Sequence, residues 1–159
     1  ETGHVMKPVG DKERKAAIDE LLQSGCSCVV CNGGGFHKYH RKGVADLYWL
    51  LTKCPAALEG AFVADKVVGK GAAALMALGG VSGVWTSVIS RPALELFERA
   101  GMEVEYGEVV PNIINREGTG LCPVETLCTD ATTPQECLPM ISKFIEQKSL
   151  ENHPIDNIK

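Results

Sequence analysis

The sequence predicts an α/β protein in which helices cover both faces of a mixed β-sheet, a three-layer α/β/α sandwich. Short apolar runs alternate along the chain with segments of helical period, and such alternation is typical of a sheet covered on both faces. Near the N-terminus, two apolar runs are separated by a glycine-rich turn. This spacing predicts a hairpin, which supplies the antiparallel part of the sheet.

The first half of the chain contains two predicted helices and three strands. Residues 12–23 place alanine and leucine on one face and charges on the other, and Gly25 ends this helix. The segment "CSCVVCNGGGFHKYH", residues 26–40, forms the hairpin. Residues 44–53 form a short helix that stops before Pro55, because the residue before a proline disfavours helix. Residues 60–64 form a short apolar strand.

The second half continues the alternation. A helix rich in glycine and alanine is predicted from Asp65, its N-cap, to residue 78, followed by a buried strand at 81–90. Pro92 and Gly101 mark the ends of the next helix. Thr133 and Glu136 form a capping box at the start of the last. The remaining elements are a strand at 102–110 and a helical turn or two at 122–128.

The composition describes one globular domain over residues 1–159, with flexible ends expected at 1–10 and 149–159. The chain is 45% hydrophobic and 23% charged, with a net charge of -4. This charge argues against a nucleic-acid partner, and no apolar run is long enough to cross a membrane. Seven cysteines, an odd number without a secretion signal, fit reduced thiols and a cytoplasmic location.

Two lysines point to a binding site for an anion. Lys66 and Lys70 lie four residues apart, on one face of the first turns of the helix expected from Asp65. Positive charge at a helix N-terminus opposes the helix dipole, and Asp65 compensates only part of it. A bound anion, held by free N–H groups and both ammonium groups, would compensate the rest. The alternative is two solvated lysines.

The run "VPNIINREGTGLCPVET", residues 110–126, suggests the second part of that site. Arg116 offers a planar fork for phosphate or carboxylate, and Asn115 and Thr119 offer directional hydrogen bonds. Glu117 completes this predicted ligand-binding group. The opposite wall of the site would consist of Asp65, Lys66 and Lys70. The alternative is a structural loop in which Arg116 pairs with Glu117 or with Asp65.

Cys122 is the candidate catalytic residue. It precedes Pro123, so it is predicted to be an N-cap, where the helix dipole lowers the pKa of a thiol. A nucleophile or a redox thiol would follow, although Glu125 partly cancels the effect. The alternative is a structural cysteine.

The pairs Cys28–Cys31 and His37–His40 have the sequence spacing of zinc ligands. Residues three apart on a strand, however, point to opposite faces of the sheet. We therefore predict buried strand cysteines and exposed hairpin histidines, and no metal site.

Three segments, residues 41–51, 60–81 and 109–128, resemble a prokaryotic domain-of-unknown-function family, family eighteen-ninety-three, with a cytidine-deaminase-like fold. The resemblance extends from about Leu21 to Ile145. It implies the α/β/α sandwich and a pocket at two helix starts, and it brings no established reaction.

The sequence departs from active deaminases, which hold zinc with an H-x-E helix start and a P-C-x-x-C helix start. Asp65, Lys66 and Val67 replace the first motif, and Ala93 and Leu96 stand where the second has its thiolates. Alanine and leucine cannot bind zinc, so we expect no cofactor and no deamination.

The sequence therefore predicts a zinc-free, deaminase-like domain that binds a small anionic ligand, such as a nucleotide or a phosphorylated metabolite. Whether it is an enzyme stays open. The alternative is a cysteine-dependent enzyme or redox protein that uses Cys122, and a third reading is a structural homo-oligomer.

Overall fold

The computed structural model describes residues 9–33, 35–40, 44–114 and 120–152. Its strands form one mixed sheet in the order β2-β1-β3-β4-β5. The pairs β1–β2 and β1–β3 are antiparallel, whereas β3–β4 and β4–β5 are parallel. The strands are β1 (Cys28–Asn32), β2 (Gly35–Tyr39), β3 (Phe62–Val68), β4 (Gly83–Ser90) and β5 (Val104–Val110).

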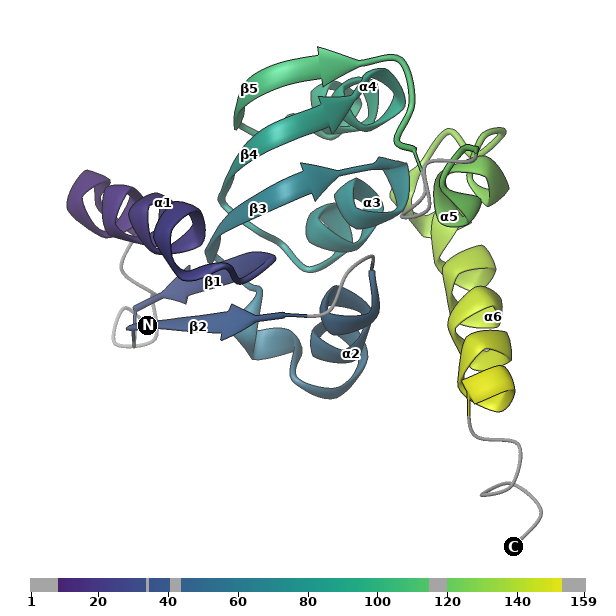
Figure 1. Cartoon of the computed structure of the whole chain (residues 1–159), viewed down its shortest axis with the longest axis horizontal. Coiled ribbons are helices and arrows are strands. Elements are labelled where there is room, and N and C mark those ends of the chain that lie inside the picture. The colour runs from purple at the N-terminus through teal and green to yellow at the C-terminus, as the bar shows by residue number, and fades with distance from the viewer. Residues whose placement is uncertain (1–8, 34, 41–43, 115–119, 153–159) are drawn as a thin grey trace, which may run out of the picture.

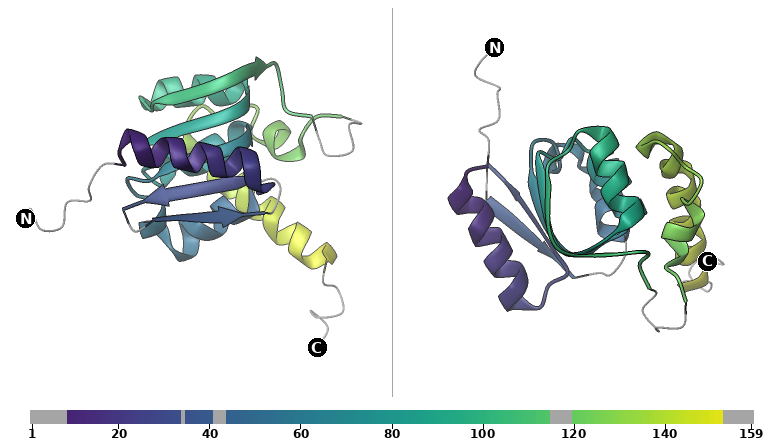
Figure 2. Two further views of the ribbon diagram at one scale, coloured as in Figure 1. Left: turned by 60° about the vertical axis from the view of Figure 1, so that its left-hand side comes forward. Right: turned by 90° about the horizontal axis from the view of Figure 1, so that it is seen from above.

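Helices cover both faces of this sheet, which makes the three predicted layers (Figures 1 and 2). The first helix, α1, packs alone against β1 and β3 on one face. The other helices lie on the opposite face or beyond it, with α6 packed against α3. The helices are α1 (Asp11–Ser24), α2 (Ala45–Lys53), the short 3-10 helix η2 (Pro55–Ala57), α3 (Lys70–Leu78), α4 (Arg91–Ala100), α5 (Pro123–Leu127) and α6 (Pro134–Asn152).

The core has two parts, one on each face of the sheet. The smaller part lies under α1 and includes Leu21, Val29 and Phe62. The larger part lies under α2, α3 and α4 and includes Leu75 and Phe97. In the described part of the chain, no helix is long and apolar enough to cross a membrane.

Most predicted elements are confirmed. The hairpin turns at Asn32 and Gly35, which face each other at its end. Gly101 ends α4 in the left-handed conformation, with φ of 71°. The predicted capping interaction at α6 is present, because the Glu136 N–H donates to Thr133 Oγ1 at 3.2 Å. The last helix continues to Asn152, past the expected beginning of a flexible end, whereas residues 1–8 and 153–159 lie outside the described residues.

The predicted start of the helix after β3 was wrong. Residues 62–68 form a strand, and α3 begins at Lys70 with Gly69 as its N-cap. Asp65 is therefore not an N-cap, and Lys66 and Lys70 do not share a helix. The reason is tertiary: β3 is hydrogen-bonded to β1 on one side and to β4 on the other, and its β-branched Val67 and Val68 suit a sheet.

The three parallel strands share an irregularity halfway along their length. Each of these strands has two residues, five positions apart in sequence, that both belong to the core on the α3 side. In a regular strand, residues separated by an odd number of positions point to opposite faces of the sheet. The register of paired residues passes over Lys66, Ser87 and Gly107 at this position, as in a bulge. The core pairs are Val63 and Val68, Val84 and Ile89, and Val104 and Val109.

This irregularity changes what the open face of the sheet presents. After it, Val67, Val88 and Val110 point away from α3. Gly107 permits the close approach of the strands, because a Cβ atom there would lie 2.8 Å from the carbonyl oxygen of Ser87. The carboxyl ends of β3, β4 and β5 thus carry apolar side chains on the side opposite the larger core.

Candidate functional site

The starts of α3 and α4 lie side by side, because each helix directly follows one of two neighbouring parallel strands (Figure 1). Helix N-termini have unpaired N–H groups and a positive dipole end. At α4, the hydroxyl of the N-cap Ser90 accepts a hydrogen bond from the N–H of Ala93 at 3.2 Å. At α3, the N-cap is a glycine, which has no side chain to accept a hydrogen bond. The acceptor for the first N–H groups of α3 must therefore come from another part of the protein.

That acceptor is the carboxylate of Glu125, which α5 brings to the two helix starts. Its side chain is buried, with 3% of the residue exposed. Glu125 Oε2 accepts from the Lys70 N–H at 2.8 Å and from the hydroxyl of Ser90. Glu125 Oε1 accepts from the Ile113 N–H at 2.7 Å. One carboxylate therefore joins α3, α4, α5 and the segment that follows β5.

The side chain of Lys70 runs into the protein. It is 5% exposed, and its ammonium group donates to the carbonyl oxygens of Thr129 at 3.1 Å and Ala131 at 2.6 Å. These carbonyls belong to the connection between α5 and α6. Lys70 thus holds α5 and α6 on α3 through its side chain while its backbone binds Glu125.

Asp65 lies in the middle of the sheet, apart from the helix starts. Burial raises the pKa of its carboxyl from 3.8 to about 7, although hydrogen bonds from the backbone N–H groups of Val67 and Lys66 oppose this shift. Cys28 lies opposite Asp65 on β1, and its thiol pKa is raised by burial and by the negative charges of Asp65 and Asp46. Lys66 is partly exposed on the same strand.

Cys122 is the N-cap of α5, as predicted, with Pro123 as the first helical residue. Its thiol makes no capping hydrogen bond, and the residue is half-buried against the larger core. Its N–H donates to the carbonyl of Ile113 at 2.8 Å. The helix that it caps has only five residues, so its dipole is short.

The predicted ligand-binding residues Asn115, Arg116, Glu117 and Thr119 lie outside the described residues. The chain enters that segment at Ile114 and leaves it toward Leu121, and these two residues form an isolated antiparallel bridge. Ile114 is 55% exposed and Leu121 is 51% exposed.

A groove of about 460 Å³ lies at the carboxyl ends of the parallel strands. The sequence alone does not reveal this groove, because the groove depends on an irregularity shared by three strands that are separate in the chain. Its lining comprises Val67, Val88, Val110, Pro111, Asn112, Ile113 and Ile114.

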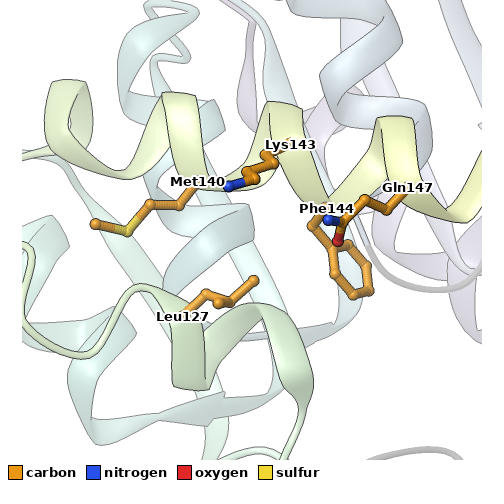
Figure 3. A pocket seen from close by; sticks show the side chains of 5 residues that line it. All are labelled: Leu127, Met140, Lys143, Phe144 and Gln147. Carbon is orange, nitrogen blue, oxygen red and sulfur yellow. The ribbon is translucent and has the colours of Figure 1, made fainter.

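A second groove, of about 420 Å³, lies between α5 and α6 (Figure 3). Leu127 faces a row of α6 side chains across it. The row comprises Met140, Lys143, Phe144 and Gln147.

The residues of the predicted zinc spacing are separated by the sheet. Cys28 belongs to the core on the α3 side, and Cys31 belongs to the core under α1. His37 and His40 are exposed. These positions confirm the expectation of opposite faces for the two cysteines and of exposed hairpin histidines. Ala93 and Leu96 are buried in the larger core at the start of α4.

The fold and the site together define a class: an α/β/α domain in which an internal carboxylate joins the two helix starts at the carboxyl edge of the sheet. Residues 16–145 match a protein family described as a domain of unknown function, DUF1893. The chain belongs to this family, which confirms the family named by the sequence resemblance; the cytidine-deaminase-like fold stays a prediction.

A solved structure supports the same assignment. The crystal structure of a DUF1893 family protein (TM1506) from Thermotoga maritima is similar, with a TM-score of 0.78 and 26% sequence identity. The similarity covers 88% of this chain and 95% of that one. No curated protein matches the chain.

Proposed function

We propose that the protein is a zinc-independent domain that binds a small anionic metabolite with a flat ring, such as a nucleotide. The ligand would lie in the groove at the carboxyl ends of β3, β4 and β5. The observation that carries this proposal is the groove itself: an apolar hollow of about 460 Å³ at the edge of parallel strands.

The position and the size of the groove favour a ligand. In open α/β sheets, ligands bind beyond the carboxyl ends of the strands, and pockets for small molecules have volumes of about 300–1,000 Å³. The walls come from Val67, Val88 and Val110, and Asn112 contributes a polar side chain. Apolar walls with a few polar groups suit a flat ring that carries polar substituents.

Cationic residues flank the lining in sequence. Lys66 precedes Val67 and is partly exposed, and the exposed Arg91 begins α4 at the end of β4. Arg116 follows the lining residue Ile114 two positions later. Because the ammonium group of Lys70 already binds two carbonyls, we assign the anionic part of the ligand to Lys66 and Arg116.

Deamination does not form part of this proposal. Glu125 accepts hydrogen bonds from both helix starts, and Ala93 and Leu96 offer no metal ligands at α4. The buried carboxylate supplies the negative charge that an anion would otherwise bring to these dipoles. The proposed ligand therefore lies in the groove rather than at the helix starts.

The test is a thermal unfolding series with nucleosides, nucleotides, sugar phosphates and inorganic phosphate. A nucleotide at a hundredfold excess over its Kd should stabilise the wild type by about 2.7 kcal/mol. Val67→Asp and Lys66→Ala should weaken that effect. Leu22→Asp, at an apolar residue of α1 that is 58% exposed, and Lys53→Ala, at an exposed lysine of α2, are the matched controls.

Two results would overturn the proposal. In the first, no member of the panel shifts the unfolding temperature. In the second, a ligand binds the Val67→Asp variant as tightly as the wild type, so that the binding site lies outside the groove.

A further inference from the structure

The face of the sheet that carries α1 is only half covered. The helix packs against β1 and β3 and reaches β4 at Trp85, which packs against the core under α1. Figure 2 shows β4 and β5 beside α1, and no helix in the described part of the chain lies over them on this side. We propose that a second copy of the chain covers this half, so that each α1 lies over β4 and β5 of the other copy in a twofold-symmetric dimer. This proposal does not depend on the proposed ligand.

The uncovered half presents two apolar residues, each with a carboxylate beside it. Trp85 and Val88 are half-buried on this side of β4. In the register of β4 and β5, Glu105 pairs with Trp85 and Glu108 pairs with Val88. Paired residues share a face of the sheet, and both glutamates are exposed. A molecule that covers this surface must therefore offer apolar contact and positive charge.

The outward face of α1 has the charge that this surface requires. Ala17 and Leu21 are buried against the sheet, and the helical period places Lys12 and Lys15 on the far side, beside the exposed Ala16. In the described part of the chain, neither these two lysines nor the two glutamates of β5 have a hydrogen-bond or ion-pair partner. Charges of opposite sign are thus available on both surfaces.

Helix α1 and the parallel strands run in the same direction. Near the start of α1, the guanidinium group of Arg14 lies 4.9 Å from the ring centre of Phe62, the first residue of β3. Just after the end of α1, the carbonyl of Ser27 accepts from the N–H of Lys66, near the end of β3, at 3.1 Å. The first half of α1, which carries both lysines, therefore lies over the starts of the strands.

One twofold axis fits these directions. Two copies that meet through the same face are related by an axis that lies in the plane of the contact. An axis along the strands keeps the strand direction and exchanges the covered half of the face with the uncovered half. The lysines of each α1 then lie over the first half of the other copy's strands, where Glu105 is the second residue of β5. An axis across the strands would instead press the two α1 helices against each other.

The dimensions of the two surfaces also agree. The 14 residues of α1 span about 21 Å, and the 7 residues of β5 span about 23 Å. Symmetry repeats the contact, so that two helix faces and two pairs of strands are buried. With a width of about 10 Å each, these surfaces amount to roughly 900 Å², close to the 1,000 Å² or so that a specific interface needs. We therefore expect a dimer that dissociates on dilution.

The first measurement is the molar mass of the wild type over a concentration series, by sedimentation equilibrium. The mass should rise from that of a monomer to that of a dimer, and added salt should favour the monomer because it screens the paired charges. A carbodiimide crosslinker should join a lysine of α1 to a glutamate of β5. In a mixture of isotopically labelled and unlabelled protein, half of these crosslinked peptides should combine both labels.

Charge reversal tests which surfaces form the contact. One variant combines Lys12→Glu with Lys15→Glu, and the other combines Glu105→Lys with Glu108→Lys. Each brings like charges together at both symmetric contacts, so each should weaken the dimer roughly tenfold or more. All four positions are exposed, and circular dichroism checks that the variants fold.

Matched controls make the same charge changes at exposed residues on other surfaces. These are Lys53→Glu with Lys143→Glu, and Glu59→Lys with Glu98→Lys. Both control variants should dimerise as the wild type does.

Mixing the two interface variants tests the symmetry. In a mixed dimer, the glutamates on α1 of one copy face the lysines on β5 of the other, and the second contact pairs the native charges. The mixture should therefore form dimers at a concentration where neither variant does. A wild type that stays monomeric across the series would overturn the proposal. Crosslinks only within one copy, interface variants that dimerise as tightly as the wild type, or a monomeric mixture would overturn it as well.

Discussion

Replacing Glu125 should lower the free energy of unfolding more than replacing any exposed glutamate. The Glu125 carboxylate accepts from the Lys70 N–H, from the Ile113 N–H and from the Ser90 hydroxyl, and it is buried. Each donor left unpaired in the interior costs about 1–3 kcal/mol. Three such donors set about 3 kcal/mol as the expected minimum for Glu125→Ala, against a typical total stability of about 5–15 kcal/mol.

Glu125→Gln isolates the hydrogen bonds from the volume of the side chain. The amide oxygen can replace one carboxylate oxygen, but the amide nitrogen cannot accept a hydrogen bond. If the amide oxygen faces α3 and α4, the amide nitrogen opposes the Ile113 N–H. We expect a loss of about 1–3 kcal/mol. For a chain of this length, 2 kcal/mol lowers the unfolding temperature by roughly 6 °C.

Urea denaturation at pH 7 measures both variants. Glu98→Ala, at an exposed glutamate of α4, is the matched control and should stay within about 0.5 kcal/mol of the wild type. The denaturation midpoint of Glu125→Gln should fall while the slope stays constant. A midpoint equal to that of the wild type would refute the view that this carboxylate holds the helix starts together.

Three further predictions concern other parts of the fold. Because folding raises the pKa of Asp65 from 3.8 to about 7, the folded protein keeps a proton that the unfolded chain releases in this range. The free energy of unfolding should then fall by up to about 4 kcal/mol as pH rises from 4 to 7, and Asp65→Asn should remove this fall; a flat wild-type profile in urea denaturation would contradict it. Gly71→Ala should lower the unfolding temperature, since its Cβ would lie 2.4 Å from Val124 Cγ1, at a cost of about 1–3 kcal/mol; Val124→Ala in the same chain should restore most of the loss, and no rescue in thermal unfolding would place the strain elsewhere. At neutral pH, iodoacetamide should alkylate the half-buried Cys122 faster than the buried Cys128, as followed by peptide mass spectrometry; equal rates would mean a structural thiol.

Local signals in the sequence were enough for most of the fold. The Asn32–Gly35 turn, Pro92, Gly101 and the Thr133 cap each act through nearby backbone geometry, so a short window of sequence contains the whole cause. The boundary between β3 and α3 is different. Asp65 has the residue type of an N-cap, but β1 and β4 pair with its segment from other parts of the chain. No local pattern shows those partners.

The site was harder to predict than the fold, for the same reason. Cys122 was predicted as an N-cap because Pro123 follows it directly. In the sequence, Glu125 stands out only as a negative charge three residues after Cys122. Its hydrogen-bond partners at Lys70 and Ser90 lie 55 and 35 residues away in sequence, and a single sequence contains no sign of that convergence.

A negatively charged group does lie at the start of α3. The dipole of α3 does attract a negative charge, and a carboxylate binds its first N–H group. The chain itself supplies this charge from α5, and Lys70 turns inward to bind carbonyls instead of a ligand. A carboxylate fixed by its own backbone loses less entropy on binding than a free anion does. An external phosphate would have to displace Glu125 and compensate three buried donors at once, so a ligand is better placed in the groove on the other face of the sheet, where Val67 and Val88 leave apolar surface uncovered.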